Sequence, residues 1–409
     1  MKKQLSLLTL FLVVFLDLLG IGIIIPILPL VFFETQLLPP EVSHATINIL
    51  LGFLIAIYPF AQFFGAPILG AIADRYGRRP VLLLSLLGAA FGYALFGLGL
   101  VLGSVWLLFF SRILAGFMAG NLAVVKSIIV DISDKRSMVK NFGLIGMGFG
   151  LGFILGPFIG GNLANPNLVS WFNPATPFWF ATILLAANIC FVYFRIPETL
   201  PSPSHIRITP WTGFVNIKKA LSMPTLNVIF ISYFLFMFGF SFFTQFYPVY
   251  MHDKFGATPS QIGTLFAFLG IWIAIAQGFL VRLFTSIKPA NILRFTFFFG
   301  SVLVLLHIFP TKIWMLFVIA PFLAINNGLN MPNVSALLSS HATKESQGEI
   351  MGIEQSLLSL AMTIPAIISG FVISYGTSLV LVLGSLFIFL GWIFFLFKYE
   401  ETKEKFSEV

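Results

Sequence analysis

Long apolar runs separated by short polar breaks dominate the sequence. We count twelve such runs, over residues 6–33, 46–72, 80–102, 105–130, 139–163, 177–195, 225–250, 261–284, 290–309, 313–338, 349–374 and 378–397. Most of them approach or exceed the roughly 20 apolar residues that a helix needs to cross the hydrocarbon core of a bilayer. A helix satisfies its own backbone hydrogen bonds, which lipid cannot do for it. The pattern therefore predicts an all-α membrane protein with twelve transmembrane helices.

The polar breaks divide these helices into two sets. The longest break runs from Arg195 to about Pro224 and is rich in proline. It predicts an N-terminal six-helix bundle over residues 1–196, a linker over 197–224 and a C-terminal six-helix bundle over 225–409. Two pseudo-symmetric bundles of six are typical of transporters that bind their substrate between the bundles, near the bilayer midplane. The first run extends to Phe33, beyond the about 7–15 residues of a signal-peptide core, so we expect a retained helix.

Composition and charge agree with this picture. Of 409 residues, 58% are hydrophobic and 9% are charged, against about 25% charged in soluble domains. The net charge of +8 does not indicate nucleic acid, because the basic residues lie in the breaks and not on one face. With the N-terminus inside, nineteen Lys and Arg residues fall in inner segments and two in outer loops. We therefore expect both termini and the linker to be cytoplasmic, in a multi-pass protein of a cell membrane, most naturally a bacterial inner membrane.

The sequence offers little for enzymatic chemistry. Cys190 is the single cysteine, and no cluster of metal ligands or nucleophiles stands at helical spacing. No G-x-x-x-x-G-K-[ST] loop is present to bind the phosphates of ATP. We therefore expect a protein that is not an enzyme, has no metal or organic cofactor, and draws its energy from a proton gradient.

A tight cationic turn joins the second and third spans. It contains Gly70, Asp74, Arg75, Gly77, Arg78 and Arg79. A cytoplasmic loop would explain the arginines but not the spacing of the glycines and the aspartate. Gly70 allows close helix approach, and Asp74 suits a helix N-terminus. The string resembles the loop signature of the major facilitator superfamily. The resemblance implies a latch that holds the outward-open state, with Arg78 or Arg79 near Asp131.

The fifth span carries a ridge of glycines. Its distinctive residues are Gly148, Gly152, Gly156, Pro157, Gly160 and Gly161. Four of the glycines recur every four residues and form a smooth surface for helix packing, while the proline introduces a kink. Such a ridge alone predicts only a packed helix. The fuller string resembles the antiporter signature of drug–proton exchangers, which favours export over uptake.

The first and fourth spans place charge at depth. Asp17 lies roughly 15–20 Å inside its helix, where a carboxylate marks either a transport pathway or a structural hydrogen bond. Arg112, followed by small residues and Asn121, must find partners for a permanent charge. Both strings resemble those of tetracycline-type proton antiporters. The resemblance implies the major facilitator fold and a role for Arg112 in proton coupling; a purely structural arginine is the alternative.

One charged residue departs from that family pattern, and a second charge lies at a similar depth in the other half. Lys126 shares a helix face with Arg112, and Glu354 lies at a similar depth in the eleventh span. Our hypothesis is that they pair across the two halves and help to close the cytoplasmic gate. Alternatively, Lys126 extends to water at the inner boundary, or Glu354 carries the proton.

The tenth span carries a polar stripe. Asn326, Asn330 and Asn333 fall at helical positions i, i+4 and i+7. Such amides hydrogen-bond either a ligand or a neighbouring helix. We favour a position on the substrate pathway, because the family places the tenth helix there.

The function that these features imply is proton-coupled efflux of small organic molecules or drugs by a monomer that works through alternating access. The main alternative is a proton-coupled importer of an anionic metabolite or a metal chelate such as a siderophore, for which Arg112 and Lys126 would supply charge complementarity. Vesicle flux under an imposed proton gradient separates the two directions. A channel would instead show flux that is independent of the gradient.

Overall fold

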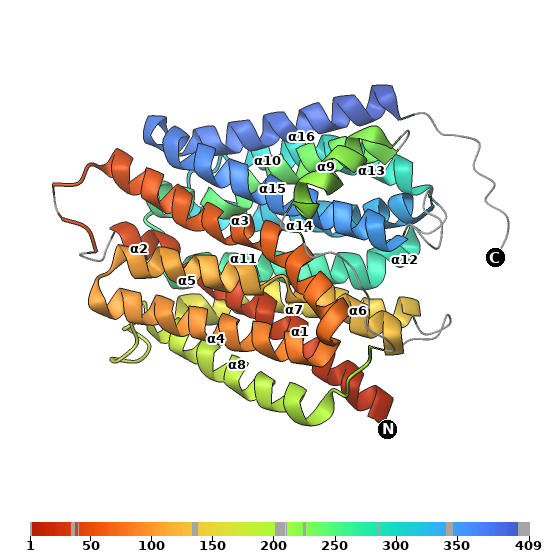
Figure 1. The fold of residues 1–409 in the computed structure, drawn as a ribbon. Helices are drawn as coiled ribbons and strands as arrows, with labels where there is room; N and C mark the ends of the chain where they lie inside the picture. Colours follow the sequence, from red (N-terminus) through yellow and green to blue (C-terminus); the bar gives the residue numbers. More distant parts are fainter. Residues whose placement is uncertain are drawn as a thin grey trace.

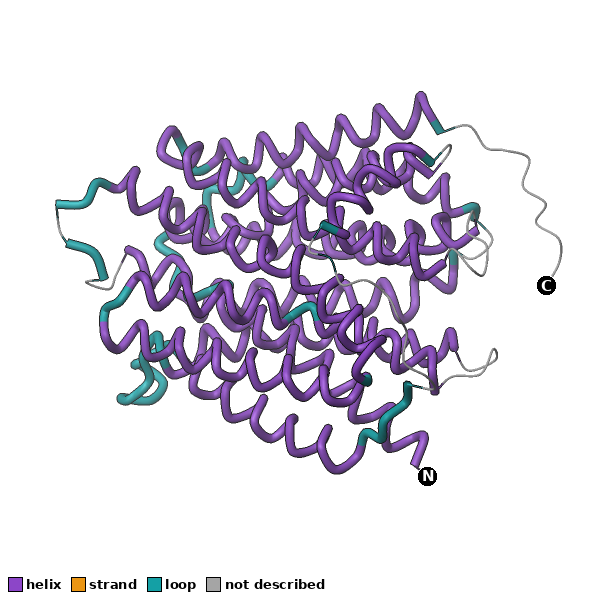
Figure 2. Tube along the Cα trace, viewed as in Figure 1, coloured by secondary structure: helices purple, strands orange, loops and turns teal. Residues whose placement is uncertain are grey.

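The protein is a bundle of long helices that run along one common axis (Figure 1). The computed structural model describes residues 2–33, 37–39, 41–132, 138–200, 209, 211–223, 226–284, 287–340 and 347–399. Within these residues every regular element is a helix, and no strand occurs (Figure 2). The predicted all-α fold is confirmed.

The helices form two sets of six spans. The first bundle contains α1 (Lys2–Ile24), α2 (Leu28–Phe33), α3 (His44–Tyr76), α4 (Arg78–Leu102), α5 (Val105–Met118), α6 (Asn121–Ile132), α7 (Met138–Leu163) and α8 (Thr176–Arg195). The second bundle contains α10 (Leu226–Phe255), α11 (Pro259–Ile275), the π-helix η1 (Ala276–Leu280), α12 (Val281–Leu283), α13 (Pro289–Leu306), α14 (Ile313–Ser340), α15 (Gln347–Val372), the 3₁₀-helix η2 (Ile373–Tyr375) and α16 (Ser378–Lys398). A further helix, α9 (Thr212–Ser222), lies within the predicted linker. The exact boundaries of the two bundles remain a proposal.

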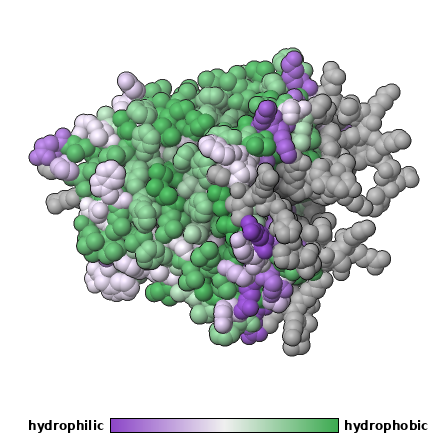
Figure 3. Space-filling model, in the orientation of Figure 1, coloured by the Kyte–Doolittle hydropathy of each residue, from purple (hydrophilic) through white to green (hydrophobic). Residues whose placement is uncertain are grey.

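The helices have the length and surface of membrane spans. Eleven helices in the described chain are long and apolar enough to cross a membrane, and the described side chains of α7 add a shorter apolar stretch, Gly150–Leu163. Apolar residues cover the middle of the visible face, and hydrophilic residues gather toward its two ends (Figure 3). The chain is thus a multi-pass membrane protein.

The first predicted span is two helices. Its break covers residues 25–27, where Ile25 and Ile27 form turn-type hydrogen bonds to Gly22 and Ile24. Pro26 lies in this break. Proline lacks the N–H that a continuing helix needs, and its ring clashes with the preceding turn. The prediction of one unbroken helix was therefore wrong at this point.

The fourth predicted span is also broken, at Ala119 and Gly120 between α5 and α6. A Cβ on Gly120 would lie 2.5 Å from the backbone nitrogen of Ala66 in α3, so the two backbones pack directly together. Gln62 of α3 donates a 3.2 Å hydrogen bond to the carbonyl oxygen of Ala119. That bond satisfies a carbonyl group at the break, and α6 begins anew at Asn121.

The two bundles meet along two helix pairs. Helix α7 packs along α11, and α3 packs along α15. We call the end of the molecule where α1 begins and α16 ends the termini side, at the right in Figure 1, and the opposite end the far side. On the far side, a Cβ on Gly52 of α3 would lie 2.7 Å from the carbonyl oxygen of Ala366 in α15. There too, Ser260 of α11 hydrogen-bonds Asn162 of α7 at 3.0 Å.

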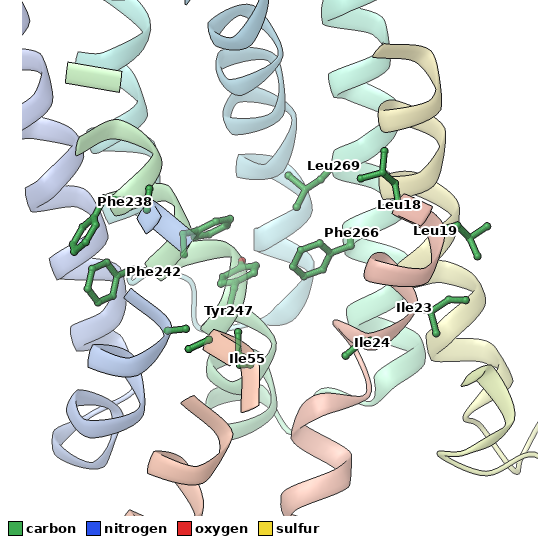
Figure 4. Packing of buried hydrophobic residues seen from close by; sticks show 14 of the residues in the cluster. Leu18, Leu19, Ile23, Ile24, Ile55, Phe238, Phe242, Tyr247, Phe266 and Leu269 are labelled. Atoms are coloured by element: carbon green, nitrogen blue, oxygen red, sulfur yellow. The ribbon is translucent and has the colours of Figure 1, made fainter. Parts of the chain in front are cut away.

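An apolar layer joins the bundles in the same region. Ile24 of α1 and Ile55 of α3 lie near Tyr247 of α10 and Phe266 of α11 (Figure 4). The ring centroids of Tyr247 and Phe266 are 6.4 Å apart, in an edge-to-face arrangement. Burial of these side chains is favourable because aromatic and aliphatic groups pack densely there. The bundles are closed against each other on the far side.

Helix α9 bridges the bundles from outside. Asn216 of α9 donates hydrogen bonds to the carbonyl oxygen of Gly352, at 3.3 Å, and to the hydroxyl of Ser356, at 3.1 Å, both on α15. Phe214 of α9 packs edge-to-face on Phe63 of α3, with ring centroids 5.1 Å apart. The linker is thereby attached to both bundles.

Candidate functional site

A hydrogen-bonded carboxylate lies inside the first bundle. The Asn121 side-chain amide donates to Oδ2 of Asp17 at 2.7 Å, and Asp17 is half-buried. Asn121 is the first residue of α6, so the break at Gly120 places its amide toward α1. Both residues were predicted to belong to the pathway, but their direct pairing was not predicted. The contact gives one carboxylate oxygen a hydrogen-bond donor, and the residue is only partly accessible.

The buried arginine stacks on an aromatic ring. The Arg112 guanidinium lies 4.2 Å from the centroid of the Tyr58 ring, and its residue is only 7% exposed. Such cation–π contact stabilises a charge that has left water. A Cβ on Gly116 would lie 2.8 Å from the Cα of Tyr58, so this glycine lets α3 and α5 come close enough for the stacking. The small residues after Arg112 thus position its partner.

Asp17 and Arg112 have two tyrosines as common neighbours. Both charges lie within electrostatic range of the hydroxyl groups of Tyr58 and Tyr93. Tyr93 of α4 packs against Gly20, one turn from Asp17. No ion pair joins Asp17 and Arg112 in the described part of the chain. A role of Arg112 in proton coupling would therefore act through Tyr58 and Tyr93. That role stays a prediction.

Lys126 and Glu354 interact across the two bundles. Lys126 lies on α6 and Glu354 on α15, and the two charges act electrostatically on one another. Both side chains are half-buried. They do not form an ion pair within 4.0 Å, and neither charged group has a hydrogen-bond partner among the described residues. The structure thus brings the two residues near each other, whereas the gate pair itself stays a prediction.

The asparagine stripe of α14 faces its own bundle in part. The Asn330 side-chain oxygen accepts a 2.6 Å hydrogen bond from Thr296 of α13. The Asn326 amide approaches Gly300 of the same helix, and Asn333 donates to the carbonyl oxygen of Leu329 at 2.7 Å. The contacts of Asn330 and Asn326 hold α14 against α13, whereas that of Asn333 lies within α14. A contribution of the stripe to a substrate pathway stays a prediction.

The cationic turn forms a network on the termini side. Arg78 pairs with Asp74, and its Nε lies 3.3 Å from Oδ2 of Asp131 at the end of α6. The contact that the resemblance implied between Arg78 and Asp131 is therefore present. Arg79 donates to the carbonyl oxygen of Tyr193 at 2.5 Å, and Arg75 lies over the ring of Tyr76. All these contacts are within the first bundle.

Gly70 and Gly77 differ in their surroundings. Gly77 has φ 113° between α3 and α4, a conformation that side chains other than hydrogen disfavour. It makes the tight turn possible. A Cβ on Gly70 would meet no described atom within 4 Å. The close helix approach expected at Gly70 is therefore not made in this state.

Glu198 completes the network, although the sequence prediction omitted it. Its carboxylate accepts backbone hydrogen bonds from Arg78 at 2.9 Å and Arg79 at 3.2 Å, at the start of α4. It also accepts bonds from the backbone of Thr199 and Leu200. A helix N-terminus favours an anion. Partial burial raises the pKa of Glu198, but these four bonds outweigh it and hold the pKa below its ordinary value.

We expect the substitution Glu198→Gln to release the linker from α4. Glutamine has one acceptor oxygen and no charge. The two backbone amides of α4 therefore lose a charged acceptor, and one of them loses its acceptor altogether. Because the folded pKa is lowered, the contribution of Glu198 is present at neutral pH and is lost as pH falls through that lowered value. Amide hydrogen exchange in peptides covering residues 77–80 measures whether the start of α4 is protected.

In the wild type, protection of these amides should fall at acid pH after correction for intrinsic exchange. In the Glu198→Gln protein, the same amides should be unprotected at every pH. Glu41→Gln, at an exposed site on the far side, is the matched control. Protection unchanged by Glu198→Gln at neutral pH would contradict the assignment.

The glycine ridge of α7 packs on α1. Cβ atoms on Gly152 and Gly156 would lie 2.7 Å from Leu18 Cβ and from the carbonyl oxygen of Leu19, respectively. Gly148 and Gly160 also contact α1, at Val14 and Ile23. The adjacent surface of α7 meets α11, where Gly161 contacts the backbone of Pro259 and Pro157 contacts Gly263. Helix α7 is therefore held between the two bundles.

Comparison with protein families agrees with this geometry. The model described as Major Facilitator Superfamily matches residues 10–311 and 229–409. The chain belongs to the Major Facilitator Superfamily. This confirms the resemblance seen in the cationic turn, and it identifies a transporter with the two-bundle, twelve-span fold.

Known members of the superfamily resemble this transporter over most of its length. It is 32% identical to "Tetracycline resistance protein, class C" of Escherichia coli over 376 residues, covering 90% of each chain. It is 29% identical to "Multidrug resistance protein 1" of Bacillus subtilis (strain 168), also covering 90% of each chain. The structure matches that of the human organic anion transporter MFSD10 (TETRAN) with a TM-score of 0.73, 23% identity, and coverage of 96% and 99%. That structural likeness shows the shared fold.

Proposed function

We propose that this transporter exports small organic molecules, drugs among them, in exchange for protons. The support comes from relatives that are named for tetracycline and multidrug resistance and that match it over nine-tenths of its length. Those relatives do not favour the alternative function, proton-coupled import of an anionic metabolite or a metal chelate. The observation that carries the proton coupling is the Asp17 carboxylate, which lies within a membrane span, half-buried, with one hydrogen bond from Asn121. A carboxylate at such depth marks a pathway for ions or substrate.

The proposed cycle alternates between two arrangements of the bundles. In this structure the bundles are closed on the far side, while toward the termini side a Cβ on Gly70 of α3 would meet no described atom within 4 Å. In the opposite state the termini side closes, and Gly70 becomes a contact surface. Proton binding at Asp17 and substrate binding shift this equilibrium in opposite directions, as differential affinity for two states requires.

The proposed orientation puts the termini side in the cytoplasm. Basic residues mark cytoplasmic loops, and the cationic turn with Arg75, Arg78 and Arg79 lies on the termini side. The structure then represents an inward-facing state. We further propose that the protein works as a monomer in a bacterial inner membrane. It needs no cofactor, and the proton gradient supplies its energy.

Everted membrane vesicles test the proposed direction. We expect vesicles that contain the transporter to accumulate tetracycline or another exported drug when the interior is acidified, and to release it when a protonophore is added. Vesicles from cells without the gene are the control. Accumulation that is insensitive to the protonophore, or movement of drug in the same direction as protons, would contradict the proposal.

A further inference from the structure

Lys126 and Glu354 lie on different bundles, and among the described residues neither charged group has a direct partner. Neither the ammonium of Lys126 nor the carboxylate of Glu354 forms a hydrogen bond or ion pair with a described residue. Their half-buried side chains lie about 9 Å and 10 Å along their helices from the termini-side ends of α6 and α15. A charge inside a membrane protein is costly, even with an opposite charge nearby, and it marks a functional site by default.

Glu354 is directed away from the outer surface of its helix. Gly352 and Ser356, two residues before and after it, both accept hydrogen bonds from Asn216 of α9. Two residues correspond to about 200° around an α-helix, so Glu354 projects from the opposite side of α15. There it interacts electrostatically with Lys126 of the first bundle and with Tyr233 of α10.

The two charges are opposite in sign, belong to different bundles and are more than 4.0 Å apart. A ligand with one charge would satisfy one of them and leave the other uncompensated. A ligand with an anionic group toward Lys126 and a cationic group toward Glu354 would satisfy both, through charge-assisted hydrogen bonds. Because its two ends would hold different bundles, such a ligand would also couple its own binding to bundle movement.

We propose that Lys126 and Glu354 form a split recognition site for zwitterionic substrates, with the negative group of the substrate at Lys126 and the positive group at Glu354. This inference rests on the proposed function, because it names the class of small molecule that the exporter carries. It differs from a gate pair, in which the two residues contact each other and the nature of the substrate is irrelevant.

Binding of matched ligands to the purified protein in detergent tests the proposal without any proton gradient. The probes are norfloxacin, which is a zwitterion, its methyl ester, which is a cation, and its N-acetyl derivative, which is an anion. A second set, built in the same way on ampicillin, guards against dependence on one scaffold. We expect a zwitterion to bind about tenfold or more tightly than its ester and its N-acetyl form, the range for one charged hydrogen bond.

The variants assign each end of the ligand. In the Lys126→Gln protein, the zwitterion should bind no more tightly than its ester. In the Glu354→Gln protein, the zwitterion should bind no more tightly than its N-acetyl form. Lys312→Gln and Glu41→Gln, both at exposed far-side positions, are the matched charge controls and should change nothing. Thermal unfolding of each variant checks that it is folded.

The proposal is overturned if neither zwitterion binds, if the zwitterions bind no tighter than their singly charged forms, or if each single variant weakens all three ligands equally. The last result would mark a gate pair instead. Failure of the proposed export has a separate signature: zwitterion preference in detergent, but no proton-dependent accumulation in vesicles.

Discussion

Replacing Asp17 with asparagine is expected to abolish proton-driven accumulation of drug, down to the level of vesicles without the transporter. A carboxylate can take up and release a proton, whereas an amide cannot. The substitution keeps the size of the side chain and an oxygen that can accept from Asn121, which donates to Asp17 at 2.7 Å. We therefore expect a folded protein that still exchanges drug down its concentration gradient but no longer moves it uphill.

Two further measurements separate this role from a structural one. Thermal unfolding should change little, because a single neutral hydrogen bond contributes only about 1 kcal/mol. The variant Asn121→Ala removes the partner but keeps the acid, so it should retain proton-driven transport with an altered pH profile. Uphill accumulation by the Asp17→Asn protein would show that another group carries the proton, and Glu354 would then be the next candidate.

The substitution Gly156→Val is expected to have the largest effect on the fold. A Cβ at this position would lie 2.7 Å from the carbonyl oxygen of Leu19 and 2.8 Å from the Cα of Gly22. These are backbone atoms, so α1 and α7 must move apart to admit the side chain. Overpacking of this kind costs about 1–3 kcal/mol and sometimes more. We expect a lower melting temperature, poor recovery of monodisperse protein and no transport.

Helix α7 offers a matched control for this experiment. A Cβ on Gly150 would meet no atom of the described residues within 4 Å. Gly150→Val therefore makes the same chemical change on the same helix without a clash, and its melting temperature should match that of the wild type. Equal destabilisation by the two variants would mean that loss of glycine in α7, and not contact with α1, causes the effect.

The apolar pattern predicted the spans well because burial in lipid is a property of each segment alone. The breaks within the spans were harder. Pro26 was visible in the sequence and gave a local reason for the break between α1 and α2. The break at Gly120 had no such local signal, because it follows from the direct packing of that glycine on Ala66 of α3.

Helix α9 was missed although its sequence carries a signal. Phe214, Ile217 and Leu221 recur at i, i+3 and i+7, the spacing of an amphipathic helix. The surrounding prolines and basic residues hid it within a segment that was interpreted as a plain linker. Its contacts with Phe63 and Ser356 depend on how the bundles meet, which no local pattern specifies.

The candidate site was predicted in its residues but not in its pairings. Asp17, Arg112 and Asn121 were recognised from charge at depth and from family strings. The contact of Asn121 with Asp17, and the position of Asp17 and Arg112 around Tyr58 and Tyr93, depend on the relative depth of five helices, which is a property of the packed bundle. Glu198 was missed because it follows the end of α8, where a lone glutamate carries no motif of its own.

Proton movement in reconstituted proteoliposomes tests the exchange of drug for protons most directly. The purified transporter is sealed into liposomes with a pH-sensitive dye inside, and an outward drug gradient is imposed without any pH gradient. Drug leaving through the transporter should bring protons in and acidify the interior in the wild type, and should leave the pH unchanged in the Asp17→Asn protein. Drug efflux without acidification, or with alkalinisation of the interior, would contradict proton-coupled export.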